Sequence, residues 1–171
     1  MTLIKSISGI RGTIGGKAGD NLTPEDIVKF TAAYGTLVQR KSKSKTIIIG
    51  RDARPSGSMV SAIVSNTLNA LGLNVVDVGL STTPTVEMAV VMEKAAGGII
   101  ITASHNPVEW NALKLLNKKG EFISDADGKE VLQLAEASDY AFVPVHKLGS
   151  YQLKTEYLDR HIKAILALKL V

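Results

Sequence analysis

The sequence contains no cysteine, few aromatic residues and no long apolar run. The absence of cysteine excludes disulfide bonds and zinc–thiolate sites, and it fits a cytoplasmic location, which we expect. No apolar stretch approaches the roughly 20 residues that cross a bilayer. Lys5 interrupts the short apolar segment at the N-terminus, which argues against a signal peptide. With 45% hydrophobic and 21% charged residues over 171 positions, the composition is typical of a globular domain of ordinary size.

The excess of positive charge is small, with 20 basic and 16 acidic residues and a formal net charge of +4. Part of this excess lies in residues 40–45, which follow a helical pattern and are most simply a solvated loop near a helix C-terminus. Nucleic-acid surfaces usually interleave aromatic and basic side chains, and only 5% of these residues are aromatic. We therefore expect no nucleic acid and no membrane as partner, whereas a small anionic substrate fits the charge.

Strand, loop and helix patterns alternate along the first hundred residues. Runs rich in isoleucine and valine are typical of strands buried on both faces, and glycine-bounded polar loops follow them. The predicted strands are residues 3–7, 46–49, 74–78 and 97–102, and the predicted helices begin near residues 23, 58, 82, 125 and 155. This alternation predicts a mainly parallel sheet between layers of helices.

The pattern weakens after residue 110. Residues 113–116 and 121–123 predict a small hairpin around a turn. Asp125 is the expected cap of the next helix, and residues 139–152 have the low periodicity of a linker. The last predicted helix, from about residue 155, is strongly apolar on one side and would need another surface to lie against.

Common phosphate and metal motifs are absent. Gly16 and Lys17 are followed by alanine, so no P-loop is present, and the glycines of residues 9–16 do not have the spacing of a dinucleotide-binding fingerprint. Residues 125–128 resemble a calcium loop for three positions only, and a helix cap explains them better.

The loops that follow the predicted strands carry cationic and nucleophilic side chains. Arg11 lies in the first glycine-rich loop, Arg51 and Arg54 in the second, and Ser104 with His105 after the isoleucine-rich strand. Because parallel strands end at the same edge of a sheet, these groups should converge as a phosphate site requires.

Ser104 and His105 do not form a hydrolase signature. Neighbouring residues on an extended chain point to opposite sides, so His105 is badly placed as a base for Ser104, and the glycines of a nucleophile elbow are missing. From the residues alone, 104–107 is equally well explained as a turn whose side chains cap the backbone.

Three motifs in order resemble those of the α-D-phosphohexomutases, the family of phosphoglucomutase, phosphomannomutase and phosphoglucosamine mutase. Thr-Ala-Ser-His-Asn-Pro at 102–107, followed by Asn111 and Lys114, resembles the phosphoserine loop. Residues 8–12 resemble the N-terminal arginine loop, and residues 50–57 resemble a second loop of the family. Trp110 and Ala112 depart from the tyrosine and glycine of many members.

The resemblance implies a role for each residue. Ser104 would carry the phosphoryl group that moves between the C1 and C6 oxygens of a hexose phosphate through a bisphosphate, and it would hold Mg²⁺ with aspartates from outside this chain. His105 would lie in the active site, and Arg11 and Lys114 would assist proton transfer or stabilise charge. The surroundings of the phosphate would include Arg51, Arg54 and Asn106.

The resemblance also implies an architecture. Residues 1–150 would form domain I of four, a three-layer α/β/α sandwich with a mixed, mainly parallel, four-stranded sheet whose last strand is antiparallel. Residues 151–171 would form a linker helix towards domain II, and the domain would pack against domains II–IV. We expect the isolated chain to be inactive. Among the activities of the family, that of phosphoglucosamine mutase is slightly preferred. The alternative is a stand-alone phosphate- or nucleic-acid-binding module that uses the loop at residues 9–12 as a backbone clamp.

Overall fold

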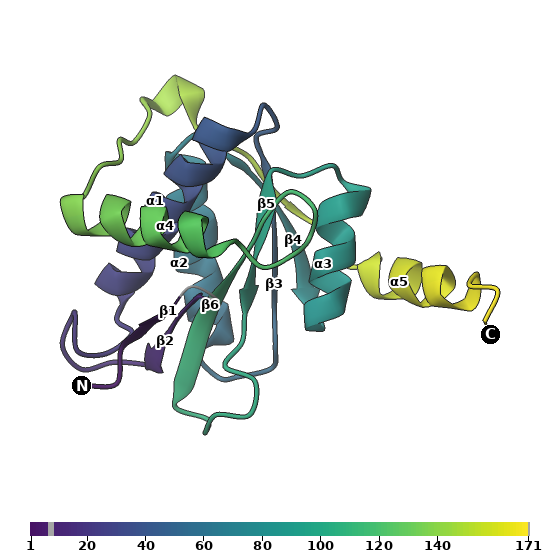
Figure 1. Cartoon of the computed structure of the whole chain (residues 1–171), viewed down its shortest axis with the longest axis horizontal. Coiled ribbons are helices and arrows are strands. Elements are labelled where there is room, and N and C mark those ends of the chain that lie inside the picture. The colour runs from purple at the N-terminus through teal and green to yellow at the C-terminus, as the bar shows by residue number, and fades with distance from the viewer. Residues whose placement is uncertain (7–8, 171) are drawn as a thin grey trace.

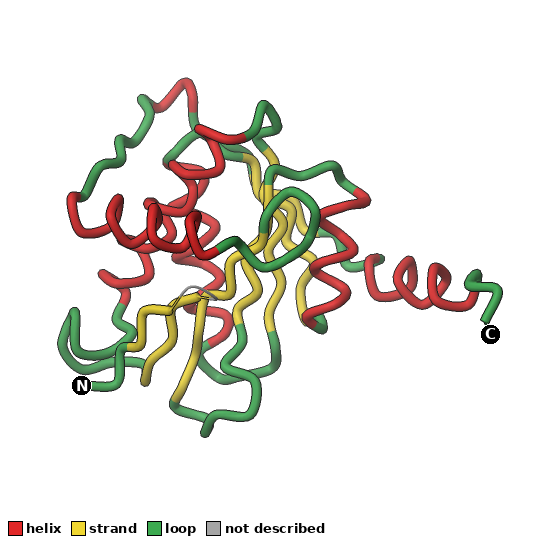
Figure 2. Tube along the Cα trace, in the orientation of Figure 1, coloured by secondary structure: helices red, strands yellow, loops and turns green. Residues whose placement is uncertain are grey.

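The computed structural model describes residues 1–6 and 9–170 (Figure 1), so positions 7 and 8 of the predicted first strand and arginine loop lie outside the description. Strands and helices alternate along most of this range (Figure 2). The strands are β1 (Ile4–Ser6), β2 (Gly9–Thr13), β3 (Thr46–Arg51), β4 (Asn74–Leu80), β5 (Gly97–Ile101), β6 (Trp110–Leu116) and β7 (Tyr151–Leu153). The helices are α1 (Pro24–Lys41), α2 (Gly57–Ala70), α3 (Thr83–Met92), α4 (Asp125–Ala137) and α5 (Tyr157–Leu166), with a 3₁₀ turn η1 (Val145–Lys147).

The strands form one mixed sheet in the order β1-β2-β6-β5-β3-β4-β7. β3 is parallel to β4 and β5, and β7 is parallel to β4, whereas the β1–β2, β2–β6 and β5–β6 pairs are antiparallel. The four inner strands β6-β5-β3-β4, with β6 antiparallel, match the predicted sheet. The prediction of four strands was wrong because β7 extends one edge and β2 and β1 extend the other.

The two additional edges come from segments predicted to be irregular. Residues 9–12 belong to β2, between β1 and β6, and not to a glycine-rich loop. Residues 139–152, predicted as a linker, include η1 and the first two residues of β7. The first strand of the predicted hairpin is part of β6. The second strand is not formed, and only a single bridge joins Phe122 to Leu116.

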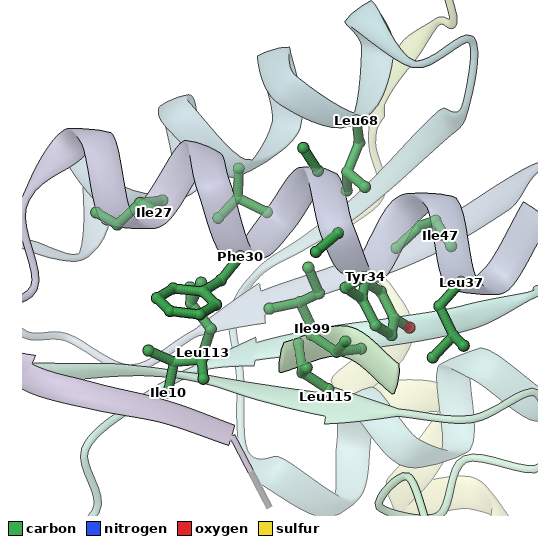
Figure 3. Packing of buried hydrophobic residues seen from close by; sticks show 14 of the residues in the cluster. Ile10, Ile27, Phe30, Tyr34, Leu37, Ile47, Leu68, Ile99, Leu113 and Leu115 are labelled. Atoms are coloured by element: carbon green, nitrogen blue, oxygen red, sulfur yellow. The ribbon is translucent and has the colours of Figure 1, made fainter. Parts of the chain in front are cut away.

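Helices cover the sheet on both sides. α1, α2 and α4 contribute to one large apolar cluster, and α3 with the start of α5 contributes to a smaller cluster on the opposite face. Tyr34 of α1 lies at the centre of the large cluster (Figure 3), where its hydroxyl donates to the carbonyl oxygens of Gly98 at 3.1 Å and Leu116 at 2.7 Å. Burial raises the pKa of this phenol, so it remains a donor that ties α1 to β5 and β6.

Local sequence signals set the helix starts. Thr23 caps α1 in a capping box with Asp26, and Pro24 is its first residue, in agreement with the predicted start near residue 23. Ser124 caps α4 through a bond from the Asp127 amide, so the prediction of Asp125 as cap was off by one position. No helix in the described part of the chain is long and apolar enough to cross a membrane.

Candidate active site

Ser104 lies where the buried strand β5 reaches the surface. All of β5 is buried, Thr102 and Ala103 are still buried, and Ser104 and His105 are exposed. β5 is parallel to β3, and the Asp52 amide donates to the carbonyl of Ile101 at 3.1 Å. The loop after β3 therefore lies beside the Ser104 loop, as the strand-end argument predicts.

Lys114 on β6 lies next to Ser104, and Arg11 lies near Lys114 on β2, the following strand of the sheet. The Lys114 ammonium group donates to Ser104 Oγ at 2.8 Å. Arg11 on β2 is paired with Ala112 on β6, and it lines a cavity of about 260 Å³ with Lys114, Ala112, Gly9 and Ser6. Lys114 thus contacts the Ser104 hydroxyl and shares a cavity with Arg11, so three of the four predicted catalytic residues lie on consecutive parts of the sheet.

The alternation of side chains along β6 explains why these cations are accessible. Leu113 and Leu115 point into the large apolar cluster, so Lys114 between them points to the opposite face. On that face α3 packs on β3 and β5, and no helix in the described part of the chain makes comparable contacts with β2 or β6. The part of the face formed by β2 and β6 is therefore open for a ligand.

Gly9 allows β2 to approach β6 beside this cavity. Its φ of +139° is a conformation that side chains disfavour, and a Cβ atom would lie 2.2 Å from the carbonyl oxygen of Leu113. The glycine of the N-terminal motif thus has a packing role, because it brings Arg11 and Lys114 onto adjacent strands.

Arg54 is fully engaged by protein acceptors. Its Nε donates to Asp52 Oδ2 at 3.2 Å, and its side chain is only 11% exposed. The remaining four N–H groups donate to backbone carbonyl oxygens, namely those of Pro107 (2.5 Å), Trp110 (3.0 Å), Ser104 (3.0 Å) and Asn106 (2.7 Å). A guanidinium group has five donors, so none is left for a phosphate.

Ser104 has a strained backbone. Its φ is +53°, in the left-handed region, where a residue other than glycine costs on the order of 1 kcal/mol or more. Its amide donates to Thr102 Oγ1 at 3.0 Å, and the Thr102 hydroxyl donates to Asp52 Oδ2 at 2.6 Å. These contacts stabilise a conformation that the serine would otherwise avoid.

The other predicted residues are placed differently. Arg51 lines a separate polar cavity of about 500 Å³ with Asp77 and Tyr151, and its Nη1 donates to the carbonyl of Asp52 at 3.2 Å. The His105 side chain is exposed at the surface, and Asn106 is half-buried with its carbonyl held by Arg54.

Sequence reasoning did not identify Asp52 and Thr102 as part of the site. One signal was present, because an aspartate two residues before Arg54 is typical of an Asx turn, and the Arg54 amide does donate to Asp52 Oδ1 at 3.1 Å. The bond between Thr102 and Asp52 links residues 50 positions apart, and nothing local predicts it.

The described residues contain no group of three histidine, aspartate or glutamate side chains that could hold a metal ion. The Asp52 carboxylate, which is linked to the Ser104 loop, already accepts bonds from Thr102 and Arg54. Ser104 alone is an incomplete site for a hard cation such as Mg²⁺, which prefers octahedral oxygen coordination.

The structure is an α/β domain in which a buried strand ends in an exposed serine beside a lysine, with an arginine on the next strand. The comparisons with known proteins agree with this class. Residues 3–141 match the family model "Phosphoglucomutase/phosphomannomutase, alpha/beta/alpha domain I". The chain belongs to the phosphoglucomutase/phosphomannomutase family and corresponds to its first domain.

Relatives in this family are longer proteins. The chain is 36% identical over 157 residues to phosphoglucosamine mutase of Francisella tularensis subsp. novicida, an alignment covering 92% of the chain and 34% of that protein. It is 34% identical over 157 residues to phosphoglucomutase/phosphomannomutase of Thermococcus kodakarensis, covering 90% of the chain and 34% of that protein. A putative phosphomannomutase from Thermus thermophilus superposes with a TM-score of 0.82 at 26% identity, over 99% of the chain and 37% of that structure. The chain thus spans about a third of the length of these relatives.

Proposed function

We propose that this chain is the phosphoserine-bearing domain of a phosphohexomutase, an intramolecular phosphotransferase that interconverts hexose 1-phosphate and hexose 6-phosphate. The observation that supports this most is the 2.8 Å contact between the Lys114 ammonium group and Ser104 Oγ, with Arg11 on the same wall. In this proposal Ser104 Oγ carries a phosphoryl group, donates it to a hydroxyl of the sugar phosphate, and takes back the other phosphoryl group after the bisphosphate reorients.

Each residue of the open face has a chemical task in the proposal. Phosphoryl transfer depends on positioning and charge neutralisation more than on covalent assistance. Lys114 would neutralise the phosphoryl oxygens on Ser104, and Arg11 would offer a planar fork to the phosphate or to the reacting hydroxyl. His105 and Asn106 would border the exposed side, where the sugar enters.

Mg²⁺ is the cofactor that the family resemblance implies, and when bound it would neutralise charge on the transferred group. Because the described residues do not supply a complete set of ligands, we propose that aspartates outside this chain complete the site. The chain alone should therefore bind Mg²⁺ only weakly.

The domain arrangement follows the same proposal. Residues 1–150 would be the first domain, and residues 151–171 would lead towards a second one. In α5, Tyr157 is buried, whereas the large apolar side chains after it are between 44% and 63% exposed, namely Leu158, Ile162, Ile165 and Leu166. We propose that further domains cover these side chains and supply the groups that grip the sugar, for which glucosamine phosphate is slightly preferred over glucose or mannose phosphate.

A chimaera tests the proposed function. This chain would replace the matching third of the Francisella phosphoglucosamine mutase, and turnover of glucosamine 6-phosphate and the mass of the Ser104 peptide would be measured. We expect turnover and one phosphoryl group on Ser104, both lost in Ser104→Ala, while this chain alone shows no turnover. A folded chimaera without phosphate on Ser104, or with the phosphate retained in Ser104→Ala, would contradict the proposal.

The nucleic-acid clamp receives no comparable support. Residues 9–12 form a strand paired on both sides, so their backbone amides and carbonyls take part in the sheet. A backbone clamp joins two helices in its usual setting and needs these groups free.

A further inference from the structure

We infer that Asp52, Arg54 and Thr102 form a brace that fixes the backbone of Ser104, and that Arg54 is a positioning residue for the phosphoryl carrier and not a phosphate ligand. The inference deepens the proposed function, and it depends on that function only for the phosphoryl group. The brace itself is a statement about this chain alone.

The first argument is the direction of the hydrogen bonds of Arg54. A phosphate ligand keeps donors free at the surface, as Lys114 does beside Ser104 Oγ. Arg54 instead directs four donors at the carbonyl oxygens of residues 104, 106, 107 and 110 and the fifth at Asp52. Binding a phosphate would require Arg54 to release part of the loop that carries the serine.

The second argument is that the contacts close into a ring around Ser104. Its amide donates to Thr102, Thr102 donates to Asp52, Asp52 accepts from Arg54, and Arg54 donates to the Ser104 carbonyl. Both backbone polar groups of the serine are therefore held at once. This explains how Ser104 keeps a φ of +53° on an exposed loop.

The third argument is the origin of the brace. Asp52 and Arg54 follow β3, whereas Thr102 and Ser104 follow β5, and these strands are paired neighbours at the centre of the sheet. The Ser104 loop is thereby tied to two buried central strands, although few of its own side chains are buried. A misplacement of about 1 Å can reduce a reaction rate on the order of a hundredfold, so a fixed loop matters for a group that must meet Lys114 and Arg11.

The carrier position can be probed without any phosphoryl transfer. The chain has no cysteine, so Ser104→Cys introduces a single thiol beside the Lys114 ammonium group. A neighbouring cation favours the reactive thiolate, and the rate of alkylation at one fixed pH therefore reports how closely the side chain at position 104 is held to Lys114.

The test combines this rate with hydrogen exchange on the whole chain. Arg54→Lys keeps the charge but cannot supply five donors, and Arg40→Lys is the matched control, because Arg40 is an ion-paired residue of α1 away from the loop. In the Ser104→Cys background we expect Arg54→Lys to slow alkylation at least about fivefold and to speed exchange of residues 102–110 about tenfold. The control should change neither, and Lys114→Met should slow alkylation without loosening the loop.

The outcomes separate the brace from the proposed function. Unchanged exchange and alkylation in Arg54→Lys would overturn the brace, whatever the state of Ser104 in the chimaera. Changes in both, with no phosphate on Ser104 in the chimaera, would leave the brace standing and remove the proposed function. If Arg54→Lys unfolds the chain, as exchange in β3 and β5 would show, the milder Asp52→Asn variant takes its place, and its expected effects have the same direction.

Discussion

The Ser104 loop and helix α5 lie largely outside the hydrophobic core, and they are held in different ways. The Ser104 loop buries little apolar surface, but its backbone is bonded at several points to Arg54. Helix α5 carries many apolar side chains, but only Tyr157 at its first turn is buried. Figure 1 shows α5 projecting beside α3, away from the body of the domain.

The contact of α5 with the domain is concentrated around Glu93. Its carboxylate accepts from the Tyr157 hydroxyl and from Lys154 Nζ at 3.1 Å, and Arg160 is 3.8 Å away. A further bond joins His161 Nδ1 and Thr85 Oγ1 at 2.9 Å. One arginine thus holds the Ser104 loop at several points along its backbone. Helix α5, despite its many apolar residues, is attached to the domain through its first two turns.

The largest expected effect is the release of α5 by Tyr157→Ala. Removing a buried aromatic side chain costs about 3 kcal/mol, and a helix of this length is marginal by itself in water. Hydrogen exchange should become fast throughout α5 and remain slow in β3 and β5. Leu166→Ala is the matched control, because Leu166 is 63% exposed on the same helix. Slow exchange of α5 in Tyr157→Ala would show that other contacts hold it.

A smaller effect is expected in the Ser104 loop from Thr102→Val. The two side chains have nearly the same shape, but valine leaves the Ser104 amide and Asp52 Oδ2 without the hydroxyl. The loss should be about 1–2 kcal/mol and local, seen as faster exchange of residues 102–107 with α5 unaffected. Thr155→Val, at an exposed position, should have no effect in the same measurement. If both variants behave alike, the Thr102 hydroxyl does not support the loop.

The sequence predicts the centre of the fold well because buried parallel strands have a distinctive composition. The runs at 46–49, 74–78 and 97–102 consist mostly of isoleucine, valine and glycine, and they form β3, β4 and β5. β2 contains two glycines among five residues, and β7 has three exposed residues. Neither carries a strand pattern of its own, and each pairs with a strand that is distant in sequence, β2 with β6 and β7 with β4.

The same reasoning applies to the site. The resemblance to a known family predicts that Ser104, Lys114 and Arg11 belong to one site. The structure places these residues on adjoining elements. Arg54 was expected near phosphate because it is an arginine after a strand. Its actual partners are carbonyl oxygens of residues 104–110, and backbone carbonyls are present at every position, so no sequence pattern predicts which of them a side chain will bind.

The smallest expected effect is a pH dependence of the attachment of α5. The Tyr157 hydroxyl, followed by Lys154 and Arg160, holds the pKa of Glu93 below its ordinary value of 4.5. A carboxyl whose pKa is lowered by folding stabilises the folded state above the unfolded pKa, and this contribution is lost as the pH falls through the folded value. Because the groups are partly exposed, we expect only about 0.5–1 kcal/mol, measured as faster exchange of α5 below pH 4.5. Glu93→Gln should remove the pH response of α5, whereas Glu87→Gln on α3 should retain it, and a pH response that persists in Glu93→Gln would mean that another group controls the attachment of α5.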